Sequence, residues 1–129
     1  MKSIKGNLIV KNKLFKNAYL HDKKIYNSIF INCVFRNITF SAEFSKVKFK
    51  NCKFQSCIFE FDSEWRKIRF IECSFTKNLF FPKTFKHIYF KSNTFYKNLT
   101  SGNILENNKF VYKVKGIKDI SQITWGDHY

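Results

Sequence analysis

The stretch that decides the fold is Phe30-Ile31-Asn32-Cys33-Val34-Phe35-Arg36-Asn37-Ile38-Thr39-Phe40, in which every fifth residue is a phenylalanine. An α-helix places apolar residues at steps of about 3.6, and a strand at steps of about 2. A step of five fits neither element, so the repeat itself must be the structural unit, as it is in solenoids. The same step continues along most of the 129-residue chain, which contains 17 phenylalanines.

The residue two places before each central residue gives the repeat its second feature. It is small, β-branched or asparagine at most positions, and lysine replaces it only at Lys13, Lys23 and Lys83. Well-formed units are Asn32-Cys33-Val34-Phe35-Arg36, Asn51-Cys52-Lys53-Phe54-Gln55 and Glu72-Cys73-Ser74-Phe75-Thr76. Over roughly residues 8–112 the chain resembles the pentapeptide-repeat family, whose motif has a small residue, a variable residue, a central Leu or Phe and two polar residues. An ordinary Phe-rich β-sandwich would not hold a period of five.

The resemblance implies an all-β fold, the right-handed quadrilateral β-helix, in which each pentapeptide forms one side of a square coil. A coil then takes about twenty residues, and residues one coil apart stack at the strand spacing of ~4.8 Å. We expect a single domain over residues 1–129, with about five coils and short terminal caps. Its repeats would span about 8–112, and its C-terminal cap would span 113–129.

Laid on such a coil, the central residues form four columns, which we call the first to fourth faces. The first face holds Val10, Phe30, Phe49, Phe70, Phe90 and Phe110. The second holds Phe15, Phe35, Phe54, Phe75 and Phe95. The third holds Leu20, Phe40, Phe59, Phe80 and Thr100, and the fourth holds Ile25, Phe44, Trp65, Phe85 and Leu105. One residue is lost between Phe40 and Phe49 and one is gained between Phe59 and Phe70, slips that a β-helix tolerates as local bulges on the fourth face.

The four cysteines follow the coil period. Cys33, Cys52 and Cys73 fall on one face in consecutive coils, and Cys57 falls on the next face. This spacing differs from the short CxxC knuckle of a zinc site, so we predict reduced, buried, metal-free thiols that act as small hydrophobes. Reduced thiols favour a cytoplasmic location. We expect no signal peptide and no membrane span, because the apolar runs are short.

The chain carries 24 Lys and Arg against 9 Asp and Glu, a net charge of +15. The best-known pentapeptide-repeat proteins protect DNA gyrase as acidic mimics of duplex DNA, and a strongly basic rod cannot imitate a polyanion. A basic stripe is expected on the first face: Lys11, Lys48, Lys50, Arg69 and Lys91. Such a stripe suits nucleic acid or another anionic surface. It also suits a solenoid that needs lysine for solubility, and scarce arginine argues against specific phosphate recognition.

The third face is predicted to present large apolar residues to solvent. The candidate partner-binding residues are Tyr19, Ile58, Phe61, Leu79, Phe81 and Leu99, with Pro82 beside them and Trp65 near the adjoining corner. Exposed apolar clusters on soluble proteins commonly mark an interface. In the alternative interpretation, residues 61–66 or the C-terminal tail fold over the cluster. That tail carries Ile117, Ile120, Ile123 and Trp125, which suit a short turn that caps the last coil or contacts a partner.

Catalysis has little support in the sequence. His21, His87 and His128 lie far apart on the coil, and the adjacent His21 and Asp22 are expected to point in different directions. No nucleotide-binding or hydrolase motif is found, and a Phe-filled interior leaves no substrate cavity. We therefore expect no enzyme activity and no cofactor. The leading hypothesis is a bacterial, non-catalytic protein-binding module, such as an immunity or resistance factor that shields a target from a toxin or inhibitor. The alternative is a basic rod that binds nucleic acid or another anionic surface; the oligomeric state is left open.

Overall fold

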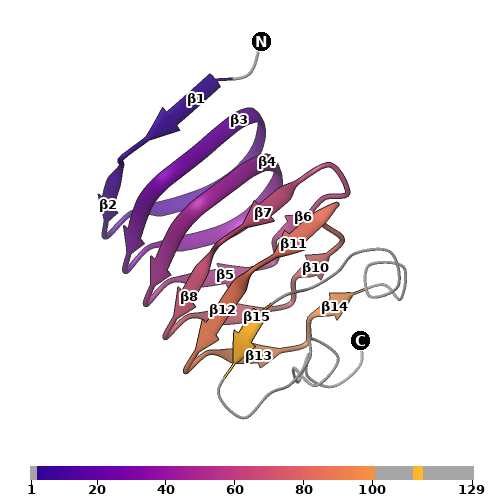
Figure 1. The fold of residues 1–129 in the computed structure, drawn as a ribbon. Helices are drawn as coiled ribbons and strands as arrows, with labels where there is room; N and C mark the ends of the chain where they lie inside the picture. The colour runs from indigo at the N-terminus through magenta and orange to yellow at the C-terminus, as the bar shows by residue number, and fades with distance from the viewer. Residues whose placement is uncertain (1–2, 101–111, 115–129) are drawn as a thin grey trace.

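The computed structural model describes residues 3–100 and 112–114 and shows a stack of square coils built from one parallel sheet (Figure 1). The strands are β1 (Ser3–Gly6), β2 (Ile9–Lys11), β3 (Leu14–Ile31), β4 (Val34–Lys50), β5 (Lys53–Gln55), β6 (Ile58–Phe59), β7 (Glu64–Arg66), β8 (Arg69–Ile71), β9 (Ser74–Thr76), β10 (Leu79–Phe80), β11 (Thr84–Lys86), β12 (Ile88–Lys91), β13 (Thr94–Tyr96), β14 (Leu99–Thr100) and β15 (Tyr112–Val114). The described residues contain no helix. The predicted all-β solenoid of about five coils is confirmed.

The strand register confirms the four predicted columns over the described coils. On the second face, Phe15 pairs with Phe35, Phe35 with Phe54, Phe54 with Phe75 and Phe75 with Phe95. The other faces keep the same step of one coil. Because the pairing is parallel and in register, each side chain lies directly over its equivalent in the coil below.

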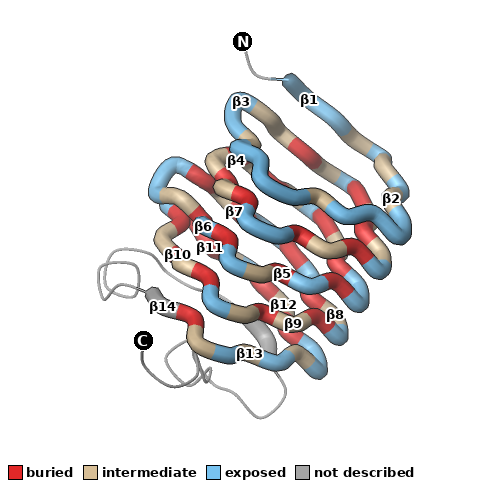
Figure 2. The backbone as a smooth tube through the Cα atoms, turned by 180° about the vertical axis from the view of Figure 1, so that it is seen from behind, coloured by how far each residue is buried: buried red, intermediate tan, exposed pale blue. Residues whose placement is uncertain are grey.

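The stacked backbone forces the central rings to stack as well. Along the second face the ring centroids of neighbouring phenylalanines lie 4.9–5.1 Å apart, close to the strand spacing. Rings on adjacent faces meet edge-on, as Phe49 and Phe54 do at an interplanar angle of 70°. Both geometries are favourable for aromatic pairs. The interior is therefore a continuous aromatic column. Around most coils buried residues alternate with exposed and half-buried ones along the backbone (Figure 2).

The corners explain why asparagine is so frequent. The residue two places after most central residues adopts a left-handed backbone conformation, with φ between 48° and 57° from Asn7 to Lys97. Asparagine tolerates this region better than most residues because its short amide can hydrogen-bond locally. Neighbouring corner amides also join across coils: Asn32 Nδ2 donates to Asn12 Oδ1 at 2.8 Å, and Asn37 Nδ2 donates to Asn17 Oδ1 at 2.9 Å.

The small residue two places before each centre lies inside the coil and satisfies its own polar atoms. Cys33, Cys52, Cys57 and Cys73 are buried and unbridged, and each thiol donates to backbone carbonyls. The predicted cysteine ladder is confirmed. Asparagine takes over this position in the later coils. The buried Asn78 accepts from Cys57 N at 2.8 Å and donates to Phe54 O at 3.0 Å.

Both predicted slips occur at the corner between the third and fourth faces. The register shifts between His21 and Lys24 where the next coil has one residue fewer, at Ala42. In the following coil the extra residue lies in a turn before Trp65. Asp22 keeps a positive φ at this corner, whereas Ala42 and Pro82, at the equivalent place in later coils, do not. This corner is where the repeat is least regular.

The two ends of the coil differ from the prediction. The first strand begins at Ser3, before the predicted start of the repeats, and Lys5 pairs with Ile25. Gly6 leaves room for the Tyr26 ring, because a Cβ atom would lie 2.2 Å from its Cζ and the ring would have to move. At the other end Phe90 pairs with Val114 instead of the predicted Phe110, so residues 113 and 114, assigned to the cap, continue the sheet. Residue 114 therefore takes the place expected for residue 110, a shift of four residues along the chain. Phe110, Leu105 and the predicted capping turn lie outside the described residues.

Candidate protein-binding surface

A tight turn at residues 60–63 presents the most exposed aromatic ring of the described chain. Ser63 N donates to Glu60 O at 3.0 Å, and Ser63 Oγ donates to the same carbonyl at 2.7 Å. The buried Trp65 indole in turn donates to Ser63 Oγ at 3.3 Å. These bonds lock the turn from inside, so Phe61 at its tip points away from the core and is 76% exposed.

Beside this turn, an apolar column runs along the third face. Strand pairing places Tyr19 next to Thr39, Thr39 next to Ile58, Ile58 next to Leu79, and Leu79 next to Leu99. We call the exposed and half-buried members, together with the turn, the third-face patch: Tyr19, Ile58, Phe61 and Leu79. Ile58 and Leu79 of the predicted cluster are neighbours in adjacent coils, whereas Thr39 lies between Tyr19 and Ile58.

Two residues assigned to this surface lie in the core instead. Trp65 has no exposed surface, because it takes the central position of the fourth face and stacks on Phe44 with a centroid distance of 4.1 Å. The prediction that it contributes to partner binding is wrong. Pro82 is also buried, and Phe81 is half-buried with its N–H bonded to Phe59 O at 2.8 Å. The backbone of Leu99 is described in β14, and its side chain lies outside the described atoms.

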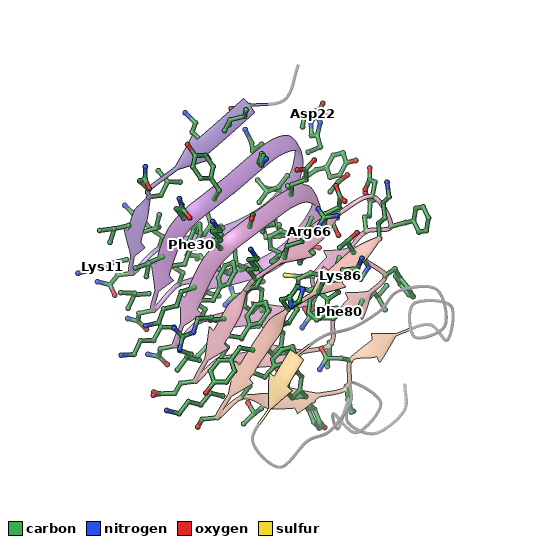
Figure 3. The ribbon with its side chains drawn as sticks, viewed as in Figure 1. Lys11, Asp22, Phe30, Arg66, Phe80 and Lys86 are labelled. Atoms are coloured by element: carbon green, nitrogen blue, oxygen red, sulfur yellow. The ribbon has the colours of Figure 1, made fainter. Side chains whose placement is uncertain are left out.

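An acidic edge, missed in the sequence analysis, follows the corner between the third and fourth faces. Its members are Asp22, Glu43, Glu60, Asp62 and Glu64. Every one falls between the third-face and fourth-face central residues of its coil, so the column assignment could have located them. In Figure 3, Asp22 marks this edge and Lys11 lies on the opposite side of the rod. A chain with a net charge of +15 thus carries its described acids almost entirely along one line.

The carboxylates of the acidic edge are held in place by neighbouring side chains. Ser41 Oγ donates to Asp62 Oδ1 at 2.5 Å, and Tyr19 Oη donates to Glu60 Oε2 at 3.4 Å. Arg66 Nη2 lies 3.2 Å from Glu64 Oε1. The edge is therefore an ordered rim around Phe61 rather than a set of free charges.

The predicted basic stripe is divided into two columns that flank the first face. Lys48 pairs with Arg69, whose guanidinium lies 5.3 Å from the centroid of the Tyr89 ring. The second column alternates: Lys50 lies between Ile31 and Ile71 in the neighbouring coils. Lys11 and Lys91 occupy the same column further along, next to Ile31 and Ile71 respectively. Ammonium groups in this column are two strand spacings apart, so charge along it is diluted by isoleucine.

Three of the four thiols, those of Cys33, Cys52 and Cys57, lie in an environment that suppresses their reactivity. Burial raises the pKa of Cys57 from 9.0 to about 11 and also raises the pKa of Cys33. The hydrogen bond with Cys73, together with burial, raises the pKa of Cys52. Thiolate is the nucleophilic form of cysteine, so these side chains have the character of structural residues.

One predicted geometry at the third-face corner is wrong. His21 Nδ1 lies 3.1 Å from Asp22 Oδ2, although the two side chains were expected to diverge, because the left-handed backbone of Asp22 turns its carboxylate back. The imidazole also stacks on Tyr19. Within residues 3–100 and 112–114, no three His, Cys, Asp or Glu side chains form a metal-binding group. The same part of the chain has no helix with the length and apolarity to cross a membrane.

Comparisons with known proteins return structural neighbours only. No family model and no curated protein matches the sequence. A trypsin-treated variant of QnrB1, a plasmid-mediated fluoroquinolone resistance protein, aligns with 100% of this chain and 91% of its own, at 13% identity and a TM-score of 0.41. Full-length QnrB1 aligns with 94% and 92% at 14% identity and a TM-score of 0.18. The chain itself is a β-solenoid with coils of about twenty residues and an inward residue on every side, consistent with the pentapeptide-repeat family that its sequence resembles.

Proposed function

We propose that this protein is a non-catalytic protein-binding module and that the third-face patch is its docking surface. The observation that carries the proposal is the exposed Phe61 ring, 76% accessible on a turn that is locked by hydrogen bonds. Ordering a turn so that a large apolar ring stays in water costs free energy unless a partner buries the ring. Aromatic anchors that are rigid before binding are typical hot spots of protein interfaces.

The surroundings of Phe61 define the chemistry of the partner. Ile58 and Leu79 extend the apolar area in adjacent coils, and the acidic edge borders it. A complementary surface has an apolar pocket for the ring and basic residues along one rim. A rod of stacked coils is also rigid, so little conformational entropy is lost on binding.

The experiment that tests the proposal compares two exposed aromatics. A photo-crosslinking amino acid replaces Phe61 in one sample and Tyr96, which is 50% exposed on the second face, in the other. Crosslinking in extracts of the source cells should recover a specific protein from the Phe61 sample and not from the Tyr96 sample. Equal recovery from both positions, or none from Phe61, contradicts the docking surface.

Substitutions then measure the contribution of the patch to affinity for the recovered partner. Phe61→Asp should weaken binding about thirtyfold, as expected for loss of a hot spot of about 2 kcal/mol. Ile58→Asp should act in the same direction, and Tyr96→Asp is the matched control. All three positions are exposed, so thermal unfolding should show unchanged folds.

The biological role that we propose for this binding is immunity or resistance, in which the rod shields its partner from a toxin or inhibitor in the cytoplasm. The support is the resemblance of the repeat to the pentapeptide family together with four unbridged thiols. Cells that express the protein should survive such an agent better than cells that express Phe61→Asp. Equal survival of the two strains would remove this role and leave the binding proposal intact.

The alternative function is binding of nucleic acid or another anionic surface, which is favoured by the adjacent Lys48 and Arg69. It predicts that reversal of Lys48, Lys50 and Lys91 to Glu abolishes binding, whereas Phe61→Asp has no effect. Affinity for a polyanion should also fall steeply between low and moderate salt, whereas apolar recognition should change little. The two mutant sets therefore give opposite results under the two functions.

A further inference from the structure

The first coil of the solenoid has a backbone edge that repeats the donor pattern of all later coils. In those coils the residue before the central residue donates its N–H to the preceding coil: Ile29 to Leu8 O, Val34 to Lys13 O, Lys53 to Cys33 O, each at 2.9 Å. The equivalent residues of the first coil are Ile9, Leu14 and Tyr19. Within the described chain, β2 pairs only with β3, and residues 14–21 pair only with β4, so no strand lies on their outer side.

Carbonyl groups alternate with these donors along the same edge. Asn7 N donates to Tyr26 O and Asn12 N donates to Ile31 O, so the residue after a central residue accepts from the preceding coil. Lys11 and Lys16 hold the equivalent places in the first coil. Their carbonyls and the N–H groups of Ile9 and Leu14 therefore form a template for one more parallel strand.

An apolar collar surrounds this edge. Ile4, Ile9 and Leu14 are 62%, 70% and 51% exposed, and each precedes a central residue on a different face. The equivalent residues two coils later are Glu43, Lys48 and Lys53. The central residues Val10, Phe15 and Leu20 are only half-buried at this end, in contrast to the buried rings that follow. Apolar side chains on the outside are thus concentrated where the backbone edge is open.

The same end is strongly basic. Its lysines are Lys5, Lys11, Lys13, Lys16, Lys23 and Lys24, and the carboxylate among residues 3–24 is Asp22. An open pocket of about 360 Å³ lies beside β1 and is lined by Ile4, Lys24, Tyr26, Asn27, Ser45 and Lys46. Two of these six residues are lysines and none is acidic, which suits an acidic side chain of a partner.

We propose that the open edge of the first coil is a second docking surface, which binds an acidic β-strand of a partner protein by strand addition. A strand supplies partners for the backbone N–H and C=O groups, and its apolar side chains cover the collar. An anionic membrane would match the charge and the collar, but its apolar interior cannot satisfy backbone donors. A second copy docked edge to edge would bring two lysine-rich ends within a few ångströms of each other, which like-charge repulsion opposes.

The test uses a synthetic peptide of about ten residues that keeps the step of five, with valine at the inward positions and glutamate at the outward positions, a length that covers two sides of the coil. Amide hydrogen exchange of the full chain is measured by NMR with and without the peptide. The amides of Ile9 and Leu14 should exchange rapidly in the free protein and become protected on binding. Those of Ile29 and Val34, which already donate to the first coil, are the internal controls and should stay protected throughout.

Two substitutions of Leu14 distinguish the contribution of its backbone N–H from that of its side chain. Leu14→Pro removes the donor at an edge where proline is tolerated, and should weaken peptide binding about five- to tenfold through loss of a backbone hydrogen bond and its neighbours. Leu14→Ala keeps the donor and should weaken binding less. Polyglutamate, and the same peptide with proline in place of its central valine, should protect neither Ile9 nor Leu14 because neither forms a strand.

Three outcomes overturn the proposal. Protection by polyglutamate equal to that by the valine–glutamate peptide would mean that charge alone acts. Slow exchange of Ile9 and Leu14 in the peptide-free protein would mean that the edge is already covered, by a second copy if sedimentation gives a dimer and by the rest of the chain if it gives a monomer. Absence of any protection by the peptide would mean that the edge does not accept a strand.

Discussion

At the residue scale, the inward position before each central ring does more than fill space. The cysteine thiols and the amides of Asn78 and Asn98 at this position are buried, and each is hydrogen-bonded to backbone of its own coil or a neighbouring one. Where this residue is Cys or Asn, it supplies hydrogen-bond partners to backbone groups of the coil. Elsewhere a buried apolar residue such as Ile38 or Ile68 fills the same position. Burial of cysteine makes the stability of the fold depend on pH, whereas asparagine contributes through its hydrogen bonds. The two contributions can be tested separately.

Burial of Cys57 makes stability depend on alkaline pH. Its pKa rises from 9.0 to about 11 on folding, so the folded state keeps the proton longer than the unfolded state. The stabilisation is complete below pH 9 and is lost as pH rises towards 11, by about 2 kcal/mol for this group. Urea unfolding between pH 8 and 11 should show this decline, and Cys57→Ala should make it shallower. An identical pH dependence in the variant would contradict the assignment.

Asn78 is the residue for which the loss of hydrogen bonds should be most costly. Asn78→Ala leaves Cys57 N and Phe54 O inside the coil without their amide partner. Each such buried group costs about 1–3 kcal/mol, so unfolding free energy should fall by about 2–4 kcal/mol. Chemical denaturation measures the change, with the exposed Lys53→Ala as control. A loss below that of the control variant would show that water replaces the amide.

At the element scale, each face is a stack of rings whose contribution depends on its place in the stack. Phe54 lies between Phe35 and Phe75 and is fully buried, whereas Phe15 has a ring neighbour on one side of its stack and is half-buried. The turn at residues 60–63, in contrast, holds the ring of Phe61 outside the coil. Position along the rod therefore decides what the same side chain contributes.

The loss of unfolding free energy in three substitutions to alanine should depend on where each ring lies in its stack. Phe54→Ala should lower the unfolding free energy by about 3–5 kcal/mol, the usual cost of removing a buried ring. Phe15→Ala should cost clearly less, and Phe61→Ala should have almost no effect on stability. Thermal and urea unfolding of the three variants provide the measurement. A large loss for Phe61→Ala would show that its ring is covered in solution.

At the scale of the whole molecule, stability is a sum over coils that contact only their neighbours. Every face carries a large apolar residue in nearly every coil. One coil can therefore take the place of another while the central residues remain stacked. The ends are different: within the described chain, no strand pairs with the outer side of β1 or β2. The acidic edge extends from Asp22 to Glu64, in the early coils. The number of coils can therefore change without loss of the fold, whereas the charges on the surface belong to particular coils.

Deletion of residues 51–71 should yield a shorter but folded rod. The deletion joins Lys50 to Glu72, so Phe75 follows Phe49 at the normal step and stacks on Phe35. Circular dichroism should be preserved per residue, and X-ray scattering should show a rod shorter by about one strand spacing of ~4.8 Å. Deletion of residues 51–68 is the control, since it breaks the step by three residues and should unfold the later coils. Similar spectra for both deletions would contradict the coil-by-coil description.

The sequence by itself determined the architecture of this protein. A phenylalanine step of five, with a small residue two places before it, identified the coil, the four columns and the inward cysteines, because a repeating unit leaves one register in which all rings are buried. It also located both slips. It placed Trp65 correctly in the fourth column but wrongly counted it among the partner-binding residues as well, because it lies next to a corner. It also expected Phe110 opposite Phe90, where the structure has Val114.

Only the tertiary structure decided what the outside of the rod presents. Exposure of Phe61 depends on the turn that Ser63 and Trp65 hold from within. The acidic edge and the basic first coil result from residues about twenty positions apart that stacking brings into line. The open edge at Ile9 and Leu14 follows from which side of a strand has no described neighbour, a property of position in the stack. Periodicity fixes what is inside, because burial is repeated in every coil, whereas surface function depends on irregularities that occur once.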